Sequence, residues 1–190
     1  SRMIGNGNDN ILTGGGAGSE LHGGGGDDTL LGAIGYLASD SLYGDDGDDV
    51  LISSAGSDRL YGGDGNDVLD GSFGHDELDG GAGDDILYAN SGASSIADND
   101  GDILYGREGN DILYDSHGRD YLIGEGGNDI LVYRYGGGDL LNGGEGDDVY
   151  IIESSGGYIV EDVGFGFDAV KSGISFVLPS NVEKLTLTGA

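Results

Sequence analysis

Aspartates that recur every nine residues are the side chains of this sequence that could do chemistry. Asp49, Asp58, Asp67, Asp76 and Asp85 keep that interval without a break. Carboxylate oxygens are hard ligands, which suit calcium better than the softer transition metals. We therefore predict metal-ligand roles for the aspartates at this repeat position: Asp28, Asp40, Asp49, Asp58, Asp67, Asp76, Asp85, Asp102, Asp111, Asp120, Asp129 and Asp148, together with Asp168.

Glycines accompany these aspartates at fixed distances. Residues 62–70, GGDGNDVLD, are followed in phase by residues 71–79, GSFGHDELD, and by residues 80–88, GGAGDDILY. Glycine thus occupies repeat positions 1, 2 and 4, aspartate position 6 and a large apolar residue position 8. Glycine allows the positive φ values of a tight turn, so we predict further oxygen ligands from turn carbonyls near Gly44, Gly62, Gly63, Gly65, Gly80, Gly81, Gly83, Gly106, Gly109 and Gly124.

The apolar position 8 indicates the elements that must hold these turns. It is occupied by Leu12, Leu21, Leu30, Leu42, Leu51, Leu60, Leu69, Leu78, Leu87, Ile96, Leu104, Leu113, Leu122, Leu131, Leu140 and Tyr150. The interval changes at an insertion around residues 36–38, between Ile96 and Leu104, and just before Tyr150. Position 6 lacks aspartate at Asn10, Ser19, Ser94 and Gly138. Three residues of alternating strand, with position 8 pointing inward, follow each six-residue turn.

If each repeat makes half a coil, turns on the same side come from alternate repeats, stacked at about 4.8 Å. This rule predicts one uninterrupted ladder, Asp28, Asp49, Asp67, Asp85, Asp102 and Asp120. It predicts a second ladder with a gap at Ser94, formed by Asp40, Asp58, Asp76, Asp111, Asp129, Asp148 and Asp168. Asn10 and Ser19 are expected to cap the stack, with weak ligation as the alternative.

Stacked carboxylates need a counter-ion. Two of them ~5 Å apart at an effective dielectric near 20 repel by about 3 kcal/mol, which is large against a net stability of ~5–15 kcal/mol. Calcium between each adjacent pair would reverse the sign, since it accepts 6–8 oxygens. We expect about nine or ten calcium ions if every pair is filled, and metal binding coupled to folding.

The nonapeptides resemble the GGxGxDxUx repeats of the RTX (repeats-in-toxin) family of secreted bacterial proteins, over about residues 5–150. The resemblance implies an all-β fold, a parallel β-roll with calcium in its turns. It also implies type I secretion, folding outside the cell, and a separate effector elsewhere in a larger polypeptide. Residues 164–189 are similar to the strand-rich segment that often follows such repeats. We therefore expect a roll over 1–150 and a strand-rich, apolar cap over 151–190.

Charge and composition limit the partners. The formal net charge is -29, with 36 acidic and 7 basic residues, which opposes direct binding of nucleic acid or an anionic membrane. No cysteine is present, so disulfides and thiolate metal sites are excluded. No apolar run approaches the ~18 residues of a membrane helix. We expect the chain to be an excised piece of a larger extracellular protein.

An active site is not expected. His22, His75 and His117 fall at different repeat positions and share no metal-binding spacing. The serines lack a nucleophile elbow, and the glycine turns lack the lysine of a phosphate loop. The many acids fit repeated metal ligation better than one acid–base pair.

Outward strand positions carry apolar side chains that could form a surface. The half-coil rule places Val50/Ile52, Ile86/Tyr88, Ile103/Tyr105 and Tyr121/Ile123 on one sheet. It places Ile112/Tyr114 and Ile130/Val132 on the other, with Arg59/Tyr61 and Glu77/Asp79. These are either ordinary β-preferring residues or a docking surface for the parent protein, a partner or a second copy. Alternatives to a structural module are an adhesin or carbohydrate-binding module using Tyr43, Tyr61, Tyr88, Tyr105 and Tyr114, and an accessory module of a secreted epimerase, protease or lipase.

Overall fold

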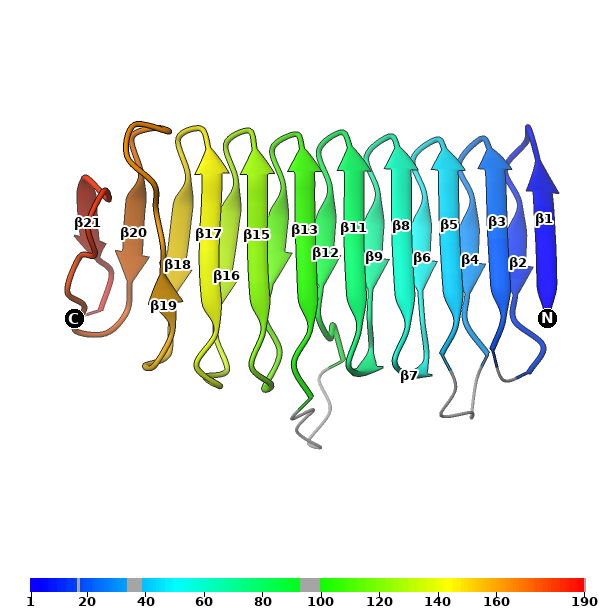
Figure 1. Cartoon of the computed structure of the whole chain (residues 1–190), viewed down its shortest axis with the longest axis horizontal. Helices are drawn as coiled ribbons and strands as arrows, with labels where there is room; N and C mark the ends of the chain where they lie inside the picture. The colour runs from blue at the N-terminus through cyan, green and yellow to red at the C-terminus, as the bar shows by residue number, and fades with distance from the viewer. Residues whose placement is uncertain (17, 34–38, 93–99, 190) are drawn as a thin grey trace.

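The chain folds into a flattened coil of parallel strands that advances steadily from the N-terminus to the C-terminus (Figure 1). The computed structural model describes residues 1–16, 18–33, 39–92 and 100–189. Every regular element within them is a β-strand, and every strand pairing is parallel. The predicted all-β parallel β-roll is therefore confirmed.

Two large sheets face each other across the core. The long-strand sheet contains β1 (Arg2–Asn6), β3 (Glu20–Gly25), β5 (Ser41–Asp46), β8 (Arg59–Asp64), β11 (Glu77–Ala82), β13 (Ile103–Glu108), β15 (Tyr121–Gly126), β17 (Leu140–Glu145) and β19 (Tyr158–Ile159). The short-strand sheet contains β2 (Ile11–Thr13), β4 (Thr29–Leu31), β6 (Val50–Ile52), β9 (Val68–Asp70), β12 (Ile86–Tyr88), β14 (Ile112–Tyr114), β16 (Ile130–Tyr133), β18 (Val149–Ile152), β20 (Ala169–Ser172) and β21 (Lys184–Leu187). A small pair, β7 (Ala55–Gly56) and β10 (Phe73–Gly74), lies in the turns.

The core is a stack of single apolar side chains, as the period at position 8 predicts. The central leucines of consecutive turns are fully buried: Leu21, Leu30, Leu42, Leu51, Leu60, Leu69, Leu78, Leu87, Leu104, Leu113, Leu122 and Leu131. Leu12 and Met3, at the N-terminal end, are partly buried against this stack. One side chain per half-coil makes a thin core, so the turns must supply much of the remaining stability.

The predicted repeat position of Leu140 is wrong by one residue. Leu141, not Leu140, pairs with Leu122 and is fully buried, so Asp139 rather than Gly138 occupies position 6. The extra residue falls earlier than expected because β16 runs on to Tyr133. The ring of Tyr133 is buried in the core, and its hydroxyl donates to the Ser155 carbonyl.

The predicted side of every turn after Tyr88 is also wrong. β13 pairs with β11, which places Ile103 beside Glu77, 26 residues away instead of 18. The half-coil expected at Ser94 and Ile96 lies outside the described residues, as does the insertion at residues 36–38. β12 and β13 lie on opposite sheets and are consecutive half-coils, although the sequence predicts one more half-coil between them, so the alternation shifts by one.

This shift exchanges the ladders and the faces. Asp102 and Asp120 follow Asp76, whereas Asp111 follows Asp85, so no gap separates neighbouring rungs of either ladder. The outward pairs exchange as well: Ile103/Tyr105 and Tyr121/Ile123 share the long-strand sheet with Arg59/Tyr61 and Glu77/Asp79, while Ile112/Tyr114 and Ile130/Val132 share the short-strand sheet with Val50/Ile52 and Ile86/Tyr88.

The tail continues both sheets. β19 pairs with β17, β20 with β18, and β21 with β20. The expected extension of the coil by this tail is thus present, while the division of the chain at residue 150 stays a prediction. Within the described residues, no helix is long and apolar enough to cross a membrane.

Candidate metal centre

The turns that lead from the long-strand sheet to the short-strand sheet form one edge of the coil, along the top of Figure 1. We call it the glycine edge. Its aspartates are Asp28, Asp49, Asp67, Asp85, Asp111, Asp129, Asp148 and Asp168. In each of the seven consecutive pairs, one aspartate's backbone N–H donates to Oδ1 of the next at 2.6–3.0 Å. The backbone therefore fixes each carboxylate in the same orientation.

The other carboxylate oxygen, Oδ2, has no partner along most of this edge. It is buried and accepts no hydrogen bond from the described residues in Asp28, Asp49, Asp67, Asp85, Asp111, Asp129 and Asp148. Burial of an unpaired charged oxygen costs several kcal/mol. A row of such atoms indicates a ligand that the protein atoms do not provide.

The glycine at turn position 1 shows where these oxygens point. A Cβ built on Gly62 would lie closer than 3.0 Å to both Asp67 Oδ2 and the carbonyl oxygen of Gly80 in the next turn. The φ of Gly62 is not positive, so glycine is needed here for space and not for its backbone conformation. The same pair of oxygens converges on Gly23, Gly44, Gly80, Gly106 and Gly124.

The pKa values of these carboxyls also indicate that a ligand belongs beside them. Burial, with a smaller contribution from neighbouring carboxylates, raises the pKa of Asp67 to about 7 and that of Asp85 to about 8. Burial likewise raises the pKa of Asp129 to about 7, and the pKa of Asp49 and Asp111 to about 6. Carboxylate and carbonyl oxygens facing one space are the donor set that calcium prefers, so the residues present fit this metal.

The opposite edge, which we call the serine edge, has a similar backbone ladder. Its members are Asp40, Asp58, Asp76, Asp102, Asp120 and Asp139, joined by five N–H···Oδ1 bonds of 2.7–3.0 Å. Position 1, however, is glycine in only some of these turns. Elsewhere it is Ser53, Ala89, Asp115 or Tyr133.

On the serine edge, groups of the protein donate hydrogen bonds to several of the Oδ2 atoms. Asp40 Oδ2 accepts from Ala33 N at 2.8 Å. Asp120 Oδ2 accepts from the backbone N and hydroxyl of Ser116, at 2.7 and 3.1 Å, and the same hydroxyl lies 3.4 Å from Asp102 Oδ2. Asp58 and Asp139 keep an Oδ2 without a described partner. The chain itself therefore satisfies part of this ladder, and the two edges are chemically different.

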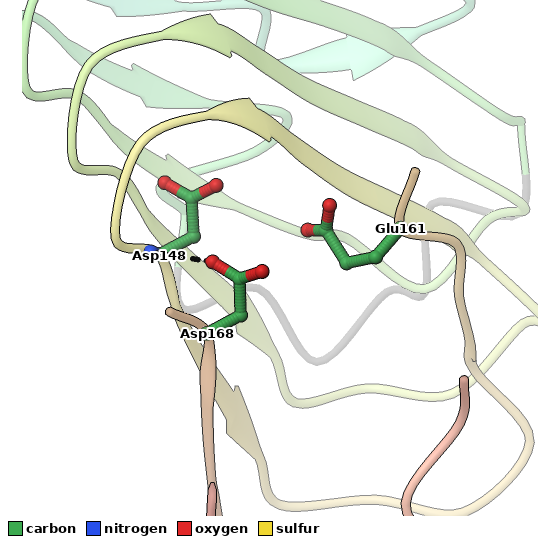
Figure 2. Close-up of side chains that lie close together, drawn as sticks. All are labelled: Asp148, Glu161 and Asp168. Carbon is green, nitrogen blue, oxygen red and sulfur yellow. Dashed lines mark hydrogen bonds between the residues drawn. The ribbon is translucent and has the colours of Figure 1, made fainter. Parts of the chain in front are cut away.

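Three buried acids escaped the repeat count. Asp139 was missed because Leu140 and Leu141 both satisfy the apolar position; the signal was an aspartate two residues before the second leucine. Asp115 accepts from Arg134 N and Tyr135 N at 2.8 and 2.9 Å, and burial raises its pKa to about 7. Glu161, from the tail, lies beside the last glycine-edge aspartates (Figure 2); it stands 18 residues after Gly143, but a glutamate at the glycine position does not match the repeat pattern.

A second, exposed ladder runs beside the glycine-edge carboxylates at turn position 5. Each backbone N–H there donates to the side-chain oxygen of the preceding turn; Asn110 N donates to Asp84 Oδ1 at 2.8 Å and Asn128 N to Asn110 Oδ1 at 3.0 Å. The same bond joins the other members, Asp9, Asp27, Asp48, Asn66 and Asp147. From Asp48 onward, asparagines separate the aspartates of this ladder, which limits the repulsion between neighbours.

The remaining sequence predictions concern histidines, ends and aromatic residues. His22 stacks on Tyr43 and His117 on Tyr135, and His75 contacts the Gly101 carbonyl, so the three are not gathered. Asn10 and Ser19 continue the backbone ladders by donating to Asp28 and Asp40; their role as caps stays a prediction.

Comparison with known proteins bears on the same residues. A family model that comprises four copies of the RTX calcium-binding nonapeptide repeat matches residues 4–36, 34–69, 61–96, 96–131 and 135–151. Over 48 residues the chain is also 44% identical to an endo-1,3-1,4-β-glycanase, ExsH, of Rhizobium meliloti (strain 1021). That stretch covers 25% of this chain and 10% of the glycanase, so the similarity concerns a small part of the enzyme.

Proposed function

Because the chain belongs to the RTX calcium-binding nonapeptide repeat family, we propose that it is a structural module of a larger secreted protein, which folds when calcium fills its turns. One observation carries the proposal: the row of buried Oδ2 atoms along the glycine edge, which from Asp28 to Asp129 each face a carbonyl of the next turn. Calcium would convert these atoms from a repulsive row into the main cross-link between consecutive coils.

The two edges lead to a finer proposal about where the ions bind. Glycine at turn position 1 leaves space beside paired oxygens along the glycine edge, while Ala33 and Ser116 donate into the corresponding space of the serine edge. The glycine edge is therefore the first to fill. The glycine edge has seven aspartate pairs, and the serine edge adds five, which makes twelve. The nine or ten ions expected from sequence lie between filling of the glycine edge alone and filling of both edges.

The net charge supports secretion of the chain in an unfolded state. A chain with a net charge of -29 resists compaction where calcium is scarce, as an unfolded export substrate requires, and folds where calcium is abundant. Export by a type I system and attachment to a separate effector are proposals that rest on the family. The partial similarity to a glycanase supports a parent that is a secreted enzyme, with this chain as a non-catalytic accessory module.

A carbohydrate-binding role has weaker support. Sugar rings bind to the free faces of aromatic side chains, but the Tyr43 ring lies between His22 and Tyr61 at centroid distances of 4.5 and 4.9 Å. Tyr88 and Tyr114 stack on each other at 4.7 Å. These contacts cover both faces of the Tyr43 ring and one face each of the Tyr88 and Tyr114 rings.

Circular dichroism across a calcium titration, starting from chelator, tests the proposal. We expect a cooperative gain of β signal with calcium and a much weaker response to magnesium, whose smaller octahedral shell fits carbonyl turns poorly. A chain that is fully folded in excess chelator at neutral pH would overturn it.

Matched variants of the two edges test the finer proposal. Asp67→Asn on the glycine edge should raise the calcium midpoint of folding about tenfold, while Asp120→Asn on the serine edge should shift it by less than about twofold, since Ser116 already donates to that carboxylate. Equal shifts for the two variants would show that both edges bind calcium alike.

A further inference from the structure

The glycine edge ends in a group of acids that differs from every repeat. Asp148 and Asp168 are its last two rungs, and Glu161 enters from the segment between β19 and β20 (Figure 2). One carboxylate oxygen from each of the three lies within 4.8 Å of the others. All three side chains are buried, with relative exposures of 1%, 7% and 2% for Asp148, Glu161 and Asp168.

The core holds Glu161 in this position through an unusual residue. Tyr150 occupies the inward position that is leucine in most coils. Its hydroxyl contacts Glu161 Oε1 and accepts from Gly143 N at 2.6 Å. Gly143 N also lies 3.3 Å from Glu161 Oε1. One oxygen of Glu161 is thus anchored, which orients the other.

Two oxygens of the group are left without a donor. Asp148 Oδ2 and Glu161 Oε2 are buried and accept no hydrogen bond from the described residues. In the repeats, the oxygen opposite Oδ2 is the carbonyl of the next turn's first glycine. In this last turn Leu141 pairs with Ile159, so Glu161 takes the position that follows Gly143 in the stack, and its carbonyl accepts from Asn181 Nδ2 at 2.8 Å. The Glu161 carboxylate therefore extends from the turn position that is glycine in the repeats, and it reaches Asp148 and Asp168.

We propose that Asp148, Glu161 and Asp168 form a terminal calcium site that fastens the tail to the coil. This inference rests on the proposed calcium-dependent function, but it assigns a ligand outside the nonapeptide repeats. The site gathers three carboxylates where a repeat offers carboxylates with a glycine carbonyl. Because charge count raises calcium affinity, this ion binds more tightly than those of the repeats. It also joins β18 and the segments that carry β19 and β20.

Counting tightly bound calcium in Glu161→Gln by equilibrium dialysis tests the site. Glutamine keeps the shape and a hydrogen-bond partner for Tyr150 but removes the charge. We expect one fewer ion in the tightest class, or at least tenfold weaker binding of that ion, with the repeat ions retained. The matched control is Glu153→Gln, an exposed acid 3.5 Å from Arg134, which should leave the count unchanged.

Terbium luminescence gives a second measurement on a variant that keeps the ligands. Energy transfer from Tyr150 should make the first equivalent of terbium luminesce under tyrosine excitation, and Tyr150→Phe should remove most of that signal. If the first-equivalent emission is unchanged in Tyr150→Phe, or if Glu161→Gln retains every tight ion, Glu161 is only a buried hydrogen-bonding partner of Tyr150 and the site does not exist. If the wild-type chain does not fold when calcium is added, that result would instead contradict the proposed function itself.

Discussion

At the scale of single residues, glycine and aspartate have separate roles in each glycine-edge turn. The aspartate offers Oδ1 to the neighbouring backbone and Oδ2 to the interior, as in Asp67. The first glycine, Gly62 in that turn, keeps the adjacent space open. Glycines further along the turn, such as Gly63 and Gly65, have positive φ values of 122° and 141° and are required by the backbone instead. The motif thus uses one residue type for two physical reasons.

Two glycines of one turn test the steric reason by itself. A Cβ on Gly124 would lie closer than 3.0 Å to Asp129 Oδ2 and the Gly143 carbonyl, whereas a Cβ on Gly126 would meet only ordinary contacts from 3.5 Å outward. Neither has a positive φ. We expect Gly124→Ala to lose about one bound ion by equilibrium dialysis and about 3 kcal/mol of stability at calcium a hundredfold above Kd. Gly126→Ala should lose less than about 1 kcal/mol; equal losses would mean that the space beside Gly124 holds no ion.

The exposed position-5 ladder predicts a charge effect. Asn110 donates to Asp84 through both its backbone N and its Nδ2, at 2.8 and 2.9 Å, and these bonds lower the pKa of Asp84. Asn110→Asp would replace a donor with a like charge, so we expect the melting temperature in calcium to fall by about 2–4 °C. The exchange Asp84→Asn/Asn110→Asp leaves no adjacent charges and should restore it. A double variant as unstable as the single one would exclude repulsion as the cause.

At the scale of the element, each strand contributes one inward side chain and two outward ones. The outward faces of the two sheets differ. Arg107 on the long-strand sheet pairs with Asp79 at 2.6 Å and with Glu125 at 2.9 Å, whereas Tyr88 and Tyr114 stack on the short-strand sheet. Tyr88 and Tyr105, expected to share a face, lie on opposite sheets. Docking or self-association stays a prediction, and the short-strand sheet is the apolar candidate.

The inward side chain should dominate strand stability. Leu113 of β14 is fully buried between Leu87 and Leu131 of the neighbouring strands. We expect Leu113→Ala to destabilise the calcium-bound chain by about 2–5 kcal/mol in urea unfolding. Ile112, its outward neighbour, is half-buried, and Ile112→Ala should cost about 1 kcal/mol. A larger loss for Ile112 would indicate that the short-strand face is covered in solution.

At the scale of the whole molecule, the chain is a one-dimensional stack in which each coil contacts mainly its neighbours. Such stacks gain stability from the interfaces between repeats. In this chain the interface consists of strand hydrogen bonds, one leucine contact and a carboxylate gap at each edge. The carboxylates repel one another when they are charged and unbound, and they stop doing so when they bind protons or calcium. We therefore expect protons and calcium both to control the fold.

The pH dependence in chelator follows from the raised pKa values. The pKa of Asp49 is about 6, that of Asp67 about 7 and that of Asp85 about 8, against an ordinary value of 3.8. Between the ordinary pKa of 3.8 and the raised pKa of about 8, these aspartates hold more protons in the folded chain than in the unfolded chain. The stability of the metal-free fold therefore rises as pH falls from about 8 to about 4.

Circular dichroism in chelator checks this prediction: β signal should increase between pH 8 and pH 5 without calcium. Calcium should reverse the trend, because protons compete for the same oxygens. A calcium-free chain that gains no structure on acidification would show that carboxylate repulsion is not what keeps it unfolded.

The sequence by itself determined the period, the parallel coil, the leucine core and the aspartates of the glycine edge up to Asp85. Each of these depends on residues within one nonapeptide, where glycine, aspartate and leucine set the local turn and strand directly. All the turn carbonyls predicted as ligands also lie on this one edge.

Only the tertiary structure decided which ladder each later aspartate joins, that Asp139 is a rung, and that Glu161 completes the end of the glycine edge. Counting by nines assigns sides correctly only while every nonapeptide forms half a coil. Between Tyr88 and Ile103 the chain departs from that rule, and one such departure exchanges every later turn. Glu161 stands at a turn position that is glycine in the repeats, and the pairing of β19 with β17 together with the Tyr150 contact brings it to Asp148 and Asp168.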